Sequence, residues 1–210
     1  MLMMFGGNGK MKHGIIKFKM TILYLYYNQP EAVKFLEKQG LPDYDVDFLF
    51  VDDASKIPLE VDWSDVIRIL IDVEWNQPYA NNMALKQLKN GIVLRMDIDH
   101  YFKKEDIIYL KLLAKFIKEN EIIHFKRGNK TPHKNIYMAR VEDLLKAGGY
   151  DERFCGNYGY DDSEFMRRLK SKKWTFTKSD IEVKINHNGG TKGLNRDTTV
   201  NKALYEKSNS

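Results

Sequence analysis

Two aspartates, Asp97 and Asp99, end an apolar segment near the middle of the chain. The residues before them, Ile92-Val93-Leu94, are apolar on both faces, which is typical of a strand covered on both sides. Ionised carboxylates at such a strand end are costly without a partner, and their i, i+2 spacing places both on one side of the strand. Oxygen ligands that converge from one side suit a hard divalent cation such as Mg²⁺ or Mn²⁺, which commonly serves a phosphate group. The spacing therefore predicts a cation site, and the alternative is that Asp99 only caps a turn before Lys103.

Polar residues also follow two earlier apolar segments. Residues 22–27 are followed by Asn28 and Gln29, and residues 48–51 by Asp52, Asp53 and Ser55. In open α/β sheets the ligand lies beyond the carboxyl ends of the strands. Each of these residues could serve as a turn residue or a helix cap, but polar residues at three strand ends together favour a ligand site.

Strand-like and helix-like segments alternate along the first half of the chain, which predicts an α/β fold with a mostly parallel central sheet flanked by helices. Its expected strands are 22–27, 48–51, 66–71 and 92–96, and its expected helices are 30–39 and 79–88. After residue 100 the order is less regular, with a helix expected over 106–120, strands over 122–125, 136–138, 174–176 and 181–185, and helices over 141–147 and 163–170. The apolar stripe of the 106–120 segment, which includes Ile107 and Leu110, is predicted to pack on the sheet rather than to hold a cofactor.

Length and composition indicate one globular domain. The chain has 210 residues, of which 43% are hydrophobic, and this is enough for one sizeable core over residues 20–210. Residues 20–100 are expected to form a nucleotide-binding half and residues 101–200 a smaller, irregular half. No segment reaches the ~18 to 20 consecutive apolar residues of a membrane span. Cys155 is the only cysteine, so no internal disulfide can form, and we expect a soluble protein of the cytoplasm.

The net charge of +5 is unevenly distributed. Four lysines between residues 1 and 19 account for most of it: Lys10, Lys12, Lys17 and Lys19. A protein that follows a nucleic-acid backbone usually concentrates its basic residues on one face of the folded body. We therefore expect residues 1–19 to be a flexible basic extension, and no nucleic-acid partner.

Four segments together resemble a known family. Val51-Asp52-Asp53-Ala54-Ser55, Met96-Asp97-Ile98-Asp99, Gly148-Gly149-Tyr150-Asp151-Glu152 and the run from Gly159 to Phe165 occur in the order found in glycosyltransferases of the GT-A fold. The resemblance is strongest to the inverting, family-2-like enzymes with a two-aspartate motif, and it covers about residues 20 to 190. It implies a GT-A fold and the metal-dependent transfer of a sugar, as in a hexosyltransferase, from a nucleoside-diphosphate sugar to a hydroxyl of a glycan or glycoprotein. UDP is the commonest nucleotide of this arrangement.

The resemblance also implies roles for individual residues. The cation, Mn²⁺ or Mg²⁺, would be held by Asp97, Asp99 and His187, and an imidazole ligand favours Mn²⁺. Asp97 would also lean toward the ribose. The base would be recognised by Asp52 or Asp53 and flanked by Tyr27, and the diphosphate would pair with Lys192 or Arg196.

The acidic run before the 163–170 helix matches the catalytic segment of the family. Inversion needs a carboxylate that takes the proton of the attacking hydroxyl, and Asp162 is the expected base, with Asp161 as the second choice. The alternative is a structural one, because aspartate before a helix is a preferred N-cap.

The chain departs from the family at Asn81-Asn82, where an Arg-Asn pair is frequent near the donor. Arg95 is not expected to replace the missing arginine, because it lies within a strand. His100, His124 and His133 form no spacing that suggests a zinc site.

Several alternatives stay open at this point. The protein could be a retaining glycosyltransferase, or a non-catalytic module that binds a nucleotide sugar or nucleic acid. A nucleotidyltransferase is less favoured, because Asn28-Gln29-Pro30 stands where a glycine-rich, arginine-bearing loop should follow the first strand. The chain is short for its class, as expected for one module of a multidomain protein. Its composition fits a bacterium or a large DNA virus, and a viral enzyme would act in the host cytoplasm.

Overall fold

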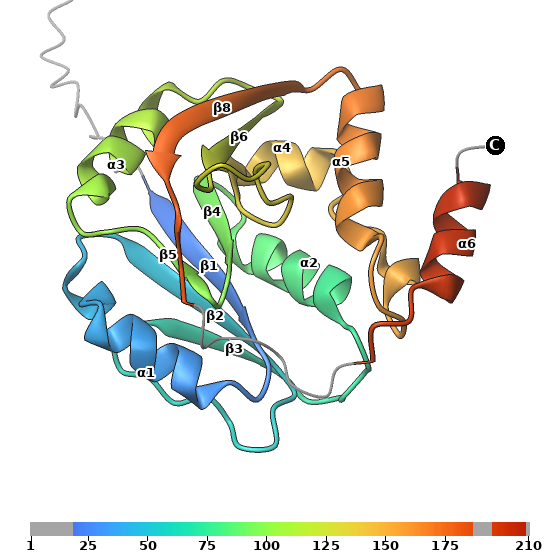
Figure 1. Ribbon diagram of the computed structural model, residues 1–210, viewed down its shortest axis with the longest axis horizontal. Coiled ribbons are helices and arrows are strands. Elements are labelled where there is room, and N and C mark those ends of the chain that lie inside the picture. Colours follow the sequence, from blue (N-terminus) through green and yellow to red (C-terminus); the bar gives the residue numbers. More distant parts are fainter. Residues whose placement is uncertain (1–18, 187–194, 209–210) are drawn as a thin grey trace, which may run out of the picture.

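The computed structural model describes residues 19–186 and 195–208. At its centre lies a seven-stranded sheet with the strand order β3-β2-β1-β4-β7-β6-β8 (Figure 1). The strands are β1 (Met20–Tyr26), β2 (Asp47–Asp53), β3 (Asp65–Ile69), β4 (Ile92–Asp97), β6 (Glu121–Lys126), β7 (Tyr137–Arg140) and β8 (Thr175–Glu182). Strands β3, β2, β1 and β4 are parallel, β7 is antiparallel to both of its neighbours, and β6 and β8 are parallel. The predicted α/β class with a mostly parallel sheet is confirmed.

Helices cover both faces of this sheet. The helices α1 (Pro30–Lys38) and α3 (Asp106–Phe116) pack on one face, and α2 (Gln77–Leu88), α4 (Val141–Lys146) and α5 (Asp161–Ser171) pack on the other (Figure 1). Strand β1 shows how the sequence produces two cores. Ile22 and Tyr24 face the α1 side while Leu23 faces the α2 side, as the two-residue period of a strand requires.

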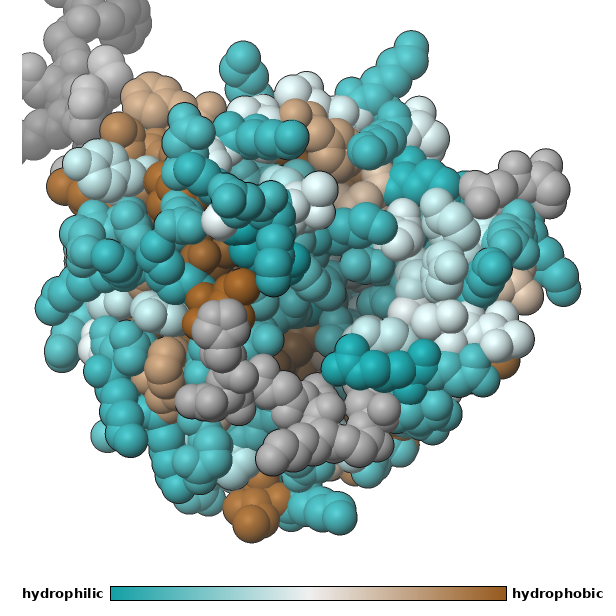
Figure 2. All heavy atoms as spheres, viewed as in Figure 1, coloured by the Kyte–Doolittle hydropathy of each residue, from teal (hydrophilic) through white to brown (hydrophobic). Residues whose placement is uncertain are grey.

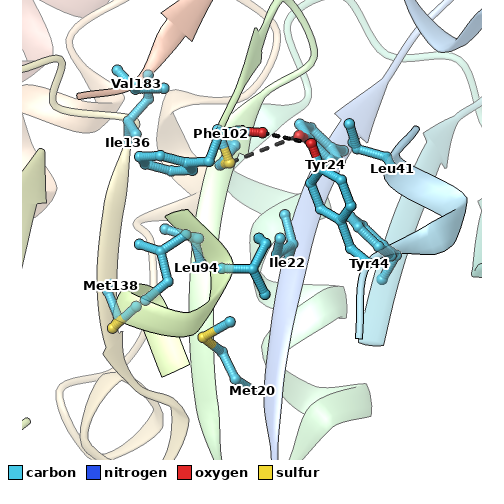
Figure 3. Close-up of a cluster of buried hydrophobic side chains, with 14 of the residues drawn as sticks. Met20, Ile22, Tyr24, Leu41, Tyr44, Leu94, Phe102, Ile136, Met138 and Val183 are labelled. Atoms are coloured by element: carbon cyan, nitrogen blue, oxygen red, sulfur yellow. Dashed lines mark hydrogen bonds between the residues drawn. The ribbon is translucent and has the colours of Figure 1, made fainter. Parts of the chain in front are cut away.

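Buried hydroxyl groups tie the first core to the segment that follows the two aspartates. The hydroxyl of Tyr24 lies 3.7 Å from the sulfur of Met96 and donates to the carbonyl oxygen of His100 at 3.1 Å. The hydroxyl of Tyr44 donates to the carbonyl oxygen of Phe102 at 2.9 Å (Figure 3). Because buried polar groups need partners, these bonds hold the backbone at His100 and Phe102.

The second half differs from the sequence prediction in three places. The helix predicted over 106–120 ends at Phe116, because Ile117 is extended with φ −61° and ψ 130°. Its apolar stripe is core, as expected, since Ile107 and Leu110 are buried. The two strands predicted at 174–176 and 181–185 are instead the long β8 and the short β9 (Lys184–Ile185). Strand β9 pairs with β5 (His100–Tyr101), and α6 (Thr199–Lys207) follows near the C-terminus. The sequence predicted neither β5 nor α6.

The structure bears in part on two further expectations, the absence of a membrane span and the basic N-terminal extension. No helix within residues 19–186 and 195–208 combines the length and the apolar character that crossing a bilayer requires. The predicted basic extension over residues 1–19 lies outside the described residues except for Lys19, whose ammonium is 3.7 Å from the carboxylate of Asp47.

Candidate active site

A cavity of about 550 Å³ opens where β1, β2 and β4 end. Its wall includes six residues that the sequence pattern indicated: Tyr27, Gln29, Asp53, Asp97, Asp99 and Arg196. The face of the molecule in Figure 2 is hollowed near its centre, with hydrophilic surface above and to the right of the hollow and a hydrophobic patch at its upper left. Asp52, Asp161 and Asp162 are not part of the cavity wall. His187 and Lys192 lie outside the described residues.

Arg95 is a buried cation beside the first aspartate of the motif. Its side chain is 1% exposed, and it forms an ion pair with Asp97. The guanidinium also donates to the carbonyl oxygen of Asn135 at 2.8 Å, to Oε1 of Gln77 at 3.1 Å and to Oδ1 of Asn81 at 3.4 Å. The guanidinium thus lies beside Asn81, but it is buried and does not line the cavity, so the expectation that Arg95 does not replace the family's arginine near the donor stays a prediction. Its backbone is in β4, but its side chain is long enough to reach α2, which a strand assignment alone does not reveal.

His133 contacts the other oxygen of the same aspartate. Its Nδ1 lies 3.3 Å from Oδ2 of Asp97, so both carboxylate oxygens of Asp97 have a partner. Burial lowers the pKa of His133, and the nearby Arg95 charge lowers it further, although Asp97 opposes both. A neutral imidazole is therefore favoured at this place near neutral pH.

The second aspartate of the motif is paired with a histidine. Nδ1 of His100 lies 2.5 Å from Oδ1 of Asp99, and the imidazole is buried with Nε2 lacking a hydrogen-bond partner among the described residues. Asp97, Asp99 and His100 each offer a ligand atom within 4.8 Å of the others. Carboxylate oxygens with an imidazole nitrogen are donors that fit Mn²⁺, and also Mg²⁺. The sequence signal for His100 was its position directly after the two aspartates.

The two aspartates that end β2 have different surroundings. Asp52 is fully buried, and its carboxylate accepts bonds from the backbone N–H groups of Ser55 and Leu59, both at 3.0 Å, and from Arg68 at 2.6 Å. This carboxylate holds the turn together and does not reach the cavity. Asp53 does reach it and accepts a bond from Nδ2 of Asn76 at 2.7 Å. Burial raises the pKa of Asp53 to about 6.

The predicted catalytic carboxylates begin α5, on the other side of the cavity wall. Asp161 is 4% exposed and accepts a bond from the indole Nε1 of Trp75 at 3.2 Å. Burial, with a contribution from Asp162, raises the pKa of Asp161 to about 6. Asp162 is half-buried and accepts a bond from the hydroxyl of Ser163 at 3.2 Å. Trp75 lines the cavity and separates it from Asp161, an arrangement that no sequence pattern indicated.

The glycine-rich segment before Asp151 is a turn that Asn82 of α2 holds. Asn82 accepts from the N–H of Tyr150 at 2.7 Å and donates to its carbonyl oxygen at 2.9 Å. Gly149 has φ +62°, and a Cβ there would lie 2.3 Å from Oδ1 of Asn82. The backbone here therefore requires glycine, because a side chain would displace the amide that fixes the turn.

Comparisons with known proteins identify the fold. No family model matches the chain, and no curated protein matches its sequence. Among solved structures, a mannosyltransferase from Pyrobaculum calidifontis in complex with GDP-Man and Mn²⁺ aligns with a TM-score of 0.62 and 14% identity, over 84% of this chain and 58% of that one. Glucosyl-3-phosphoglycerate synthase from Mycobacterium tuberculosis, in complex with Mn²⁺ and UDP-glucose, aligns with a TM-score of 0.59 and 12% identity, over 91% and 77%.

A third structure represents another enzyme class on a related sheet. A putative glucose-1-phosphate thymidylyltransferase from Bacillus anthracis, in complex with sucrose, aligns with a TM-score of 0.52 and 10% identity, over 89% of this chain and 95% of that one. The chain spans little more than half of the mannosyltransferase's length. At these identities the comparisons establish the architecture, and the chain has the mixed α/β GT-A fold of nucleotide-sugar glycosyltransferases.

Proposed function

We propose that the protein is a metal-dependent glycosyltransferase that moves a sugar from a UDP-sugar to a hydroxyl of a glycan or glycoprotein, with inversion. The observation that carries this proposal is the group formed by Asp97, Asp99 and His100 at the end of β4. The two aspartates share a cavity with Tyr27 and Asp53, which suit a nucleoside. A donor of this kind presents a base, a diphosphate and a sugar, and the cavity offers a polar group for each part of its nucleotide.

The nucleoside is assigned to the wall formed by β1 and β2. Asp53 is the better candidate for recognition of the base, because both oxygens of Asp52 already accept hydrogen bonds, from the turn that follows β2 and from Arg68 on β3. A carboxylate accepts hydrogen bonds from N–H groups of a base. Tyr27 lies beside it, with its hydroxyl 3.3 Å from the carboxylate of Asp72.

The cation is assigned to Asp99 and His100, with Asp97 beside them. Mn²⁺ bound there would neutralise the charge that develops on the diphosphate as the glycosidic bond breaks. Because both oxygens of Asp97 already have partners, Asp99 is the stronger ligand candidate of the two aspartates. His187, the ligand expected from the family, stays a prediction.

Inversion requires a base on the side of the acceptor. The acceptor oxygen attacks the anomeric carbon, the carbon–oxygen bond to the diphosphate breaks with its electrons, and the base takes the hydroxyl proton. Asp162 remains our choice for this role. It is the more exposed of the two carboxylates that begin α5, whereas Asp161 is buried behind Trp75. Nucleotidyl transfer is less supported, because Asn28-Gln29-Pro30 follows β1 in place of a glycine-rich, arginine-bearing loop.

Calorimetry with a panel of UDP-, GDP- and dTDP-sugars tests the proposal. In the presence of Mn²⁺ we expect binding of a UDP-sugar, and addition of EDTA should weaken it at least about tenfold. Asp99→Ala should have the same effect as EDTA. Asp180→Ala, which removes an exposed carboxylate on β8, is the matched control and should bind as the wild type does. Binding that is equally strong with EDTA would contradict the metal-dependent function.

A further inference from the structure

Two adjacent residues of the loop between β3 and α2, Trp75 and Asn76, contact opposite walls of the cavity. Trp75 has a positive φ of +48°, a conformation that costs an aromatic residue of the order of 1–3 kcal/mol. Asn76 donates to Asp53 at 2.7 Å on the β2 side, while the indole of Trp75 donates to Asp161 at 3.2 Å on the α5 side. Strain of this kind persists only where the surroundings hold it, so the position of Trp75 is specified by the fold.

A second aromatic residue completes the wall on the α5 side. The rings of Trp75 and Tyr158 lie 4.4 Å apart between centroids, are tilted by 58°, and both line the cavity. Arg196 also lines it, and its guanidinium donates to the hydroxyl of Tyr158 at 3.1 Å. The wall therefore combines two apolar ring surfaces with a polar, cationic rim.

The backbone that carries Tyr158 is held from two sides. The N–H of Gly156 donates to the carbonyl oxygen of Glu74 at 2.9 Å, which joins this segment to the loop of Trp75. The fully buried Asn201 of α6 donates to the carbonyl oxygens of Asn157 at 2.6 Å and Gly159 at 2.9 Å. Both aromatic residues are therefore pre-positioned, which lowers the entropy cost of binding a ligand.

Asp161 has the features of a group that orients the indole. Its Oδ1 accepts the Trp75 bond, while Oδ2 is buried and has no hydrogen-bond partner among the described residues. Burying a carboxylate with one oxygen unpartnered costs free energy. The contact made by the other oxygen is the hydrogen bond that holds the indole of Trp75. The neighbouring Asp162 has the exposure that a base needs to meet an acceptor.

We propose that Trp75 and Tyr158 form the acceptor subsite, which takes the apolar C–H face of a sugar ring, with Asp161 as the positioning residue for Trp75. This inference rests on the proposed glycosyltransferase function and adds to it the part of the cavity that the nucleoside does not use. A pyranose has apolar faces and a rim of hydroxyl groups, which matches a wall of two rings edged by Arg196. A sugar stacked there lies on the α5 side, which carries Asp162.

Saturation-transfer difference NMR with methyl glycosides tests the subsite directly. The probes are methyl glucopyranoside, methyl galactopyranoside and methyl mannopyranoside, each with saturating UDP and Mg²⁺, and the affinity for UDP is measured separately by calorimetry. In the wild type we expect saturation of the ring C–H protons of at least one glycoside. Trp75→Ala and Tyr158→Ala should reduce that signal at least about fivefold while changing the Kd of UDP by no more than about twofold.

Two substitutions at the same position, one conservative and one not, test the role of Asp161. Asp161→Asn keeps an oxygen that accepts the indole N–H and should retain the glycoside signal, whereas Asp161→Ala should reduce it as Trp75→Ala does. The control variant is Tyr109→Ala, which removes an aromatic ring that is 60% exposed on α3. It should change neither the glycoside signal nor the Kd of UDP.

Two results would overturn the subsite. One is a wild type that binds UDP but transfers saturation to none of the glycosides. The other is a Trp75→Ala variant that weakens UDP binding at least about fivefold and leaves the glycoside signal unchanged, which would place the aromatic pair against the donor nucleoside instead. Because UDP and glycosides are read separately, a wild type that fails to bind UDP contradicts the proposed function and not the subsite.

Discussion

Arg95 and Asp97, two residues apart on β4, form an ion pair in which only Asp97 lines the cavity; the side chain of Arg95 is 1% exposed and that of Asp97 21% exposed. Residues i and i+2 of a strand point to the same face, so the pairing follows from the strand geometry. The pair satisfies the first aspartate of the motif inside the protein. It leaves the second, Asp99, as the carboxylate with more capacity to bind a cation.

The Arg95 pair should be important for stability. Arg95→Met keeps much of the side-chain volume but leaves Asp97 without its cation, and breaking a buried pair in this way typically costs about 3–5 kcal/mol. We expect a loss of this order in the free energy of unfolding, measured by urea denaturation at pH 7. The control is Arg153→Met, which removes an arginine that is 68% exposed and paired with Asp151, and whose loss should lower the free energy of unfolding far less, because water screens an exposed pair. Equal losses in the two variants would contradict the role assigned to Arg95.

Gly149 should tolerate a side chain less well than Gly156, although both have positive φ. An alanine Cβ at Gly149 would lie 2.3 Å from Oδ1 of Asn82, whereas at Gly156, with φ +88°, it would meet nothing within 4 Å. Both substitutions place an alanine in the left-handed backbone region, which destabilises the fold by about 1–2 kcal/mol. Gly149→Ala should lower the Tm further than Gly156→Ala, by about 2–4 °C for each additional kcal/mol. Thermal unfolding of the two variants decides this, and a larger effect at Gly156 would refute it.

Asp161 should make stability depend on pH. Burial raises its folded pKa to about 6, above its unfolded value of about 3.9, so the folded state binds the proton more tightly. Its contribution to stability is fully present below about pH 4 and is lost as the pH rises through about 6. Asp161→Asn does not titrate, so its stability relative to the wild type should increase by about 1–3 kcal/mol between pH 4 and pH 7. Urea denaturation at several pH values measures this difference, and a difference that is constant with pH would show that Asp161 does not titrate in this range.

Asp162→Asn should separate chemistry from binding. Loss of a general base reduces kcat by about 10² to 10⁴-fold, while the Kd of the UDP-sugar should stay within about twofold of the wild-type value. Release of UDP in the presence of a glycan acceptor selected by screening measures the first quantity, and calorimetry measures the second. Normal turnover by this variant would show that another residue is the base.

The sheet and the ends of its strands could be predicted from the sequence because the signals are local. Strands β1, β2 and β4 have apolar runs of strand length, and the polar residues that line the cavity come directly after them. The difference between Asp52 and Asp53 could not be predicted in the same way. It depends on Arg68, 16 positions away, whose guanidinium binds one carboxylate and leaves the other to the cavity.

Other parts of the site depend on contacts between distant segments. Trp75 and Asp161 are 86 positions apart, and only the folded chain brings the indole to the carboxylate. The β5–β9 ladder is two residues long on each side, too short to produce a periodic pattern. Arg95 had a weak signal, a charged residue within an apolar strand, but its reach to α2 could not be inferred from that signal.

We propose that the aspartates at the end of β4 hold a cation for a diphosphate. A crystal soaked with Mn²⁺ and a UDP-sugar tests it most directly, with anomalous diffraction used to locate the manganese. We predict an anomalous peak within bonding distance, about 2.2 Å, of a carboxylate oxygen of Asp99, with the diphosphate on its other side. Nucleotide bound in the cavity with no manganese at Asp99, or manganese bound only elsewhere, would contradict the proposal.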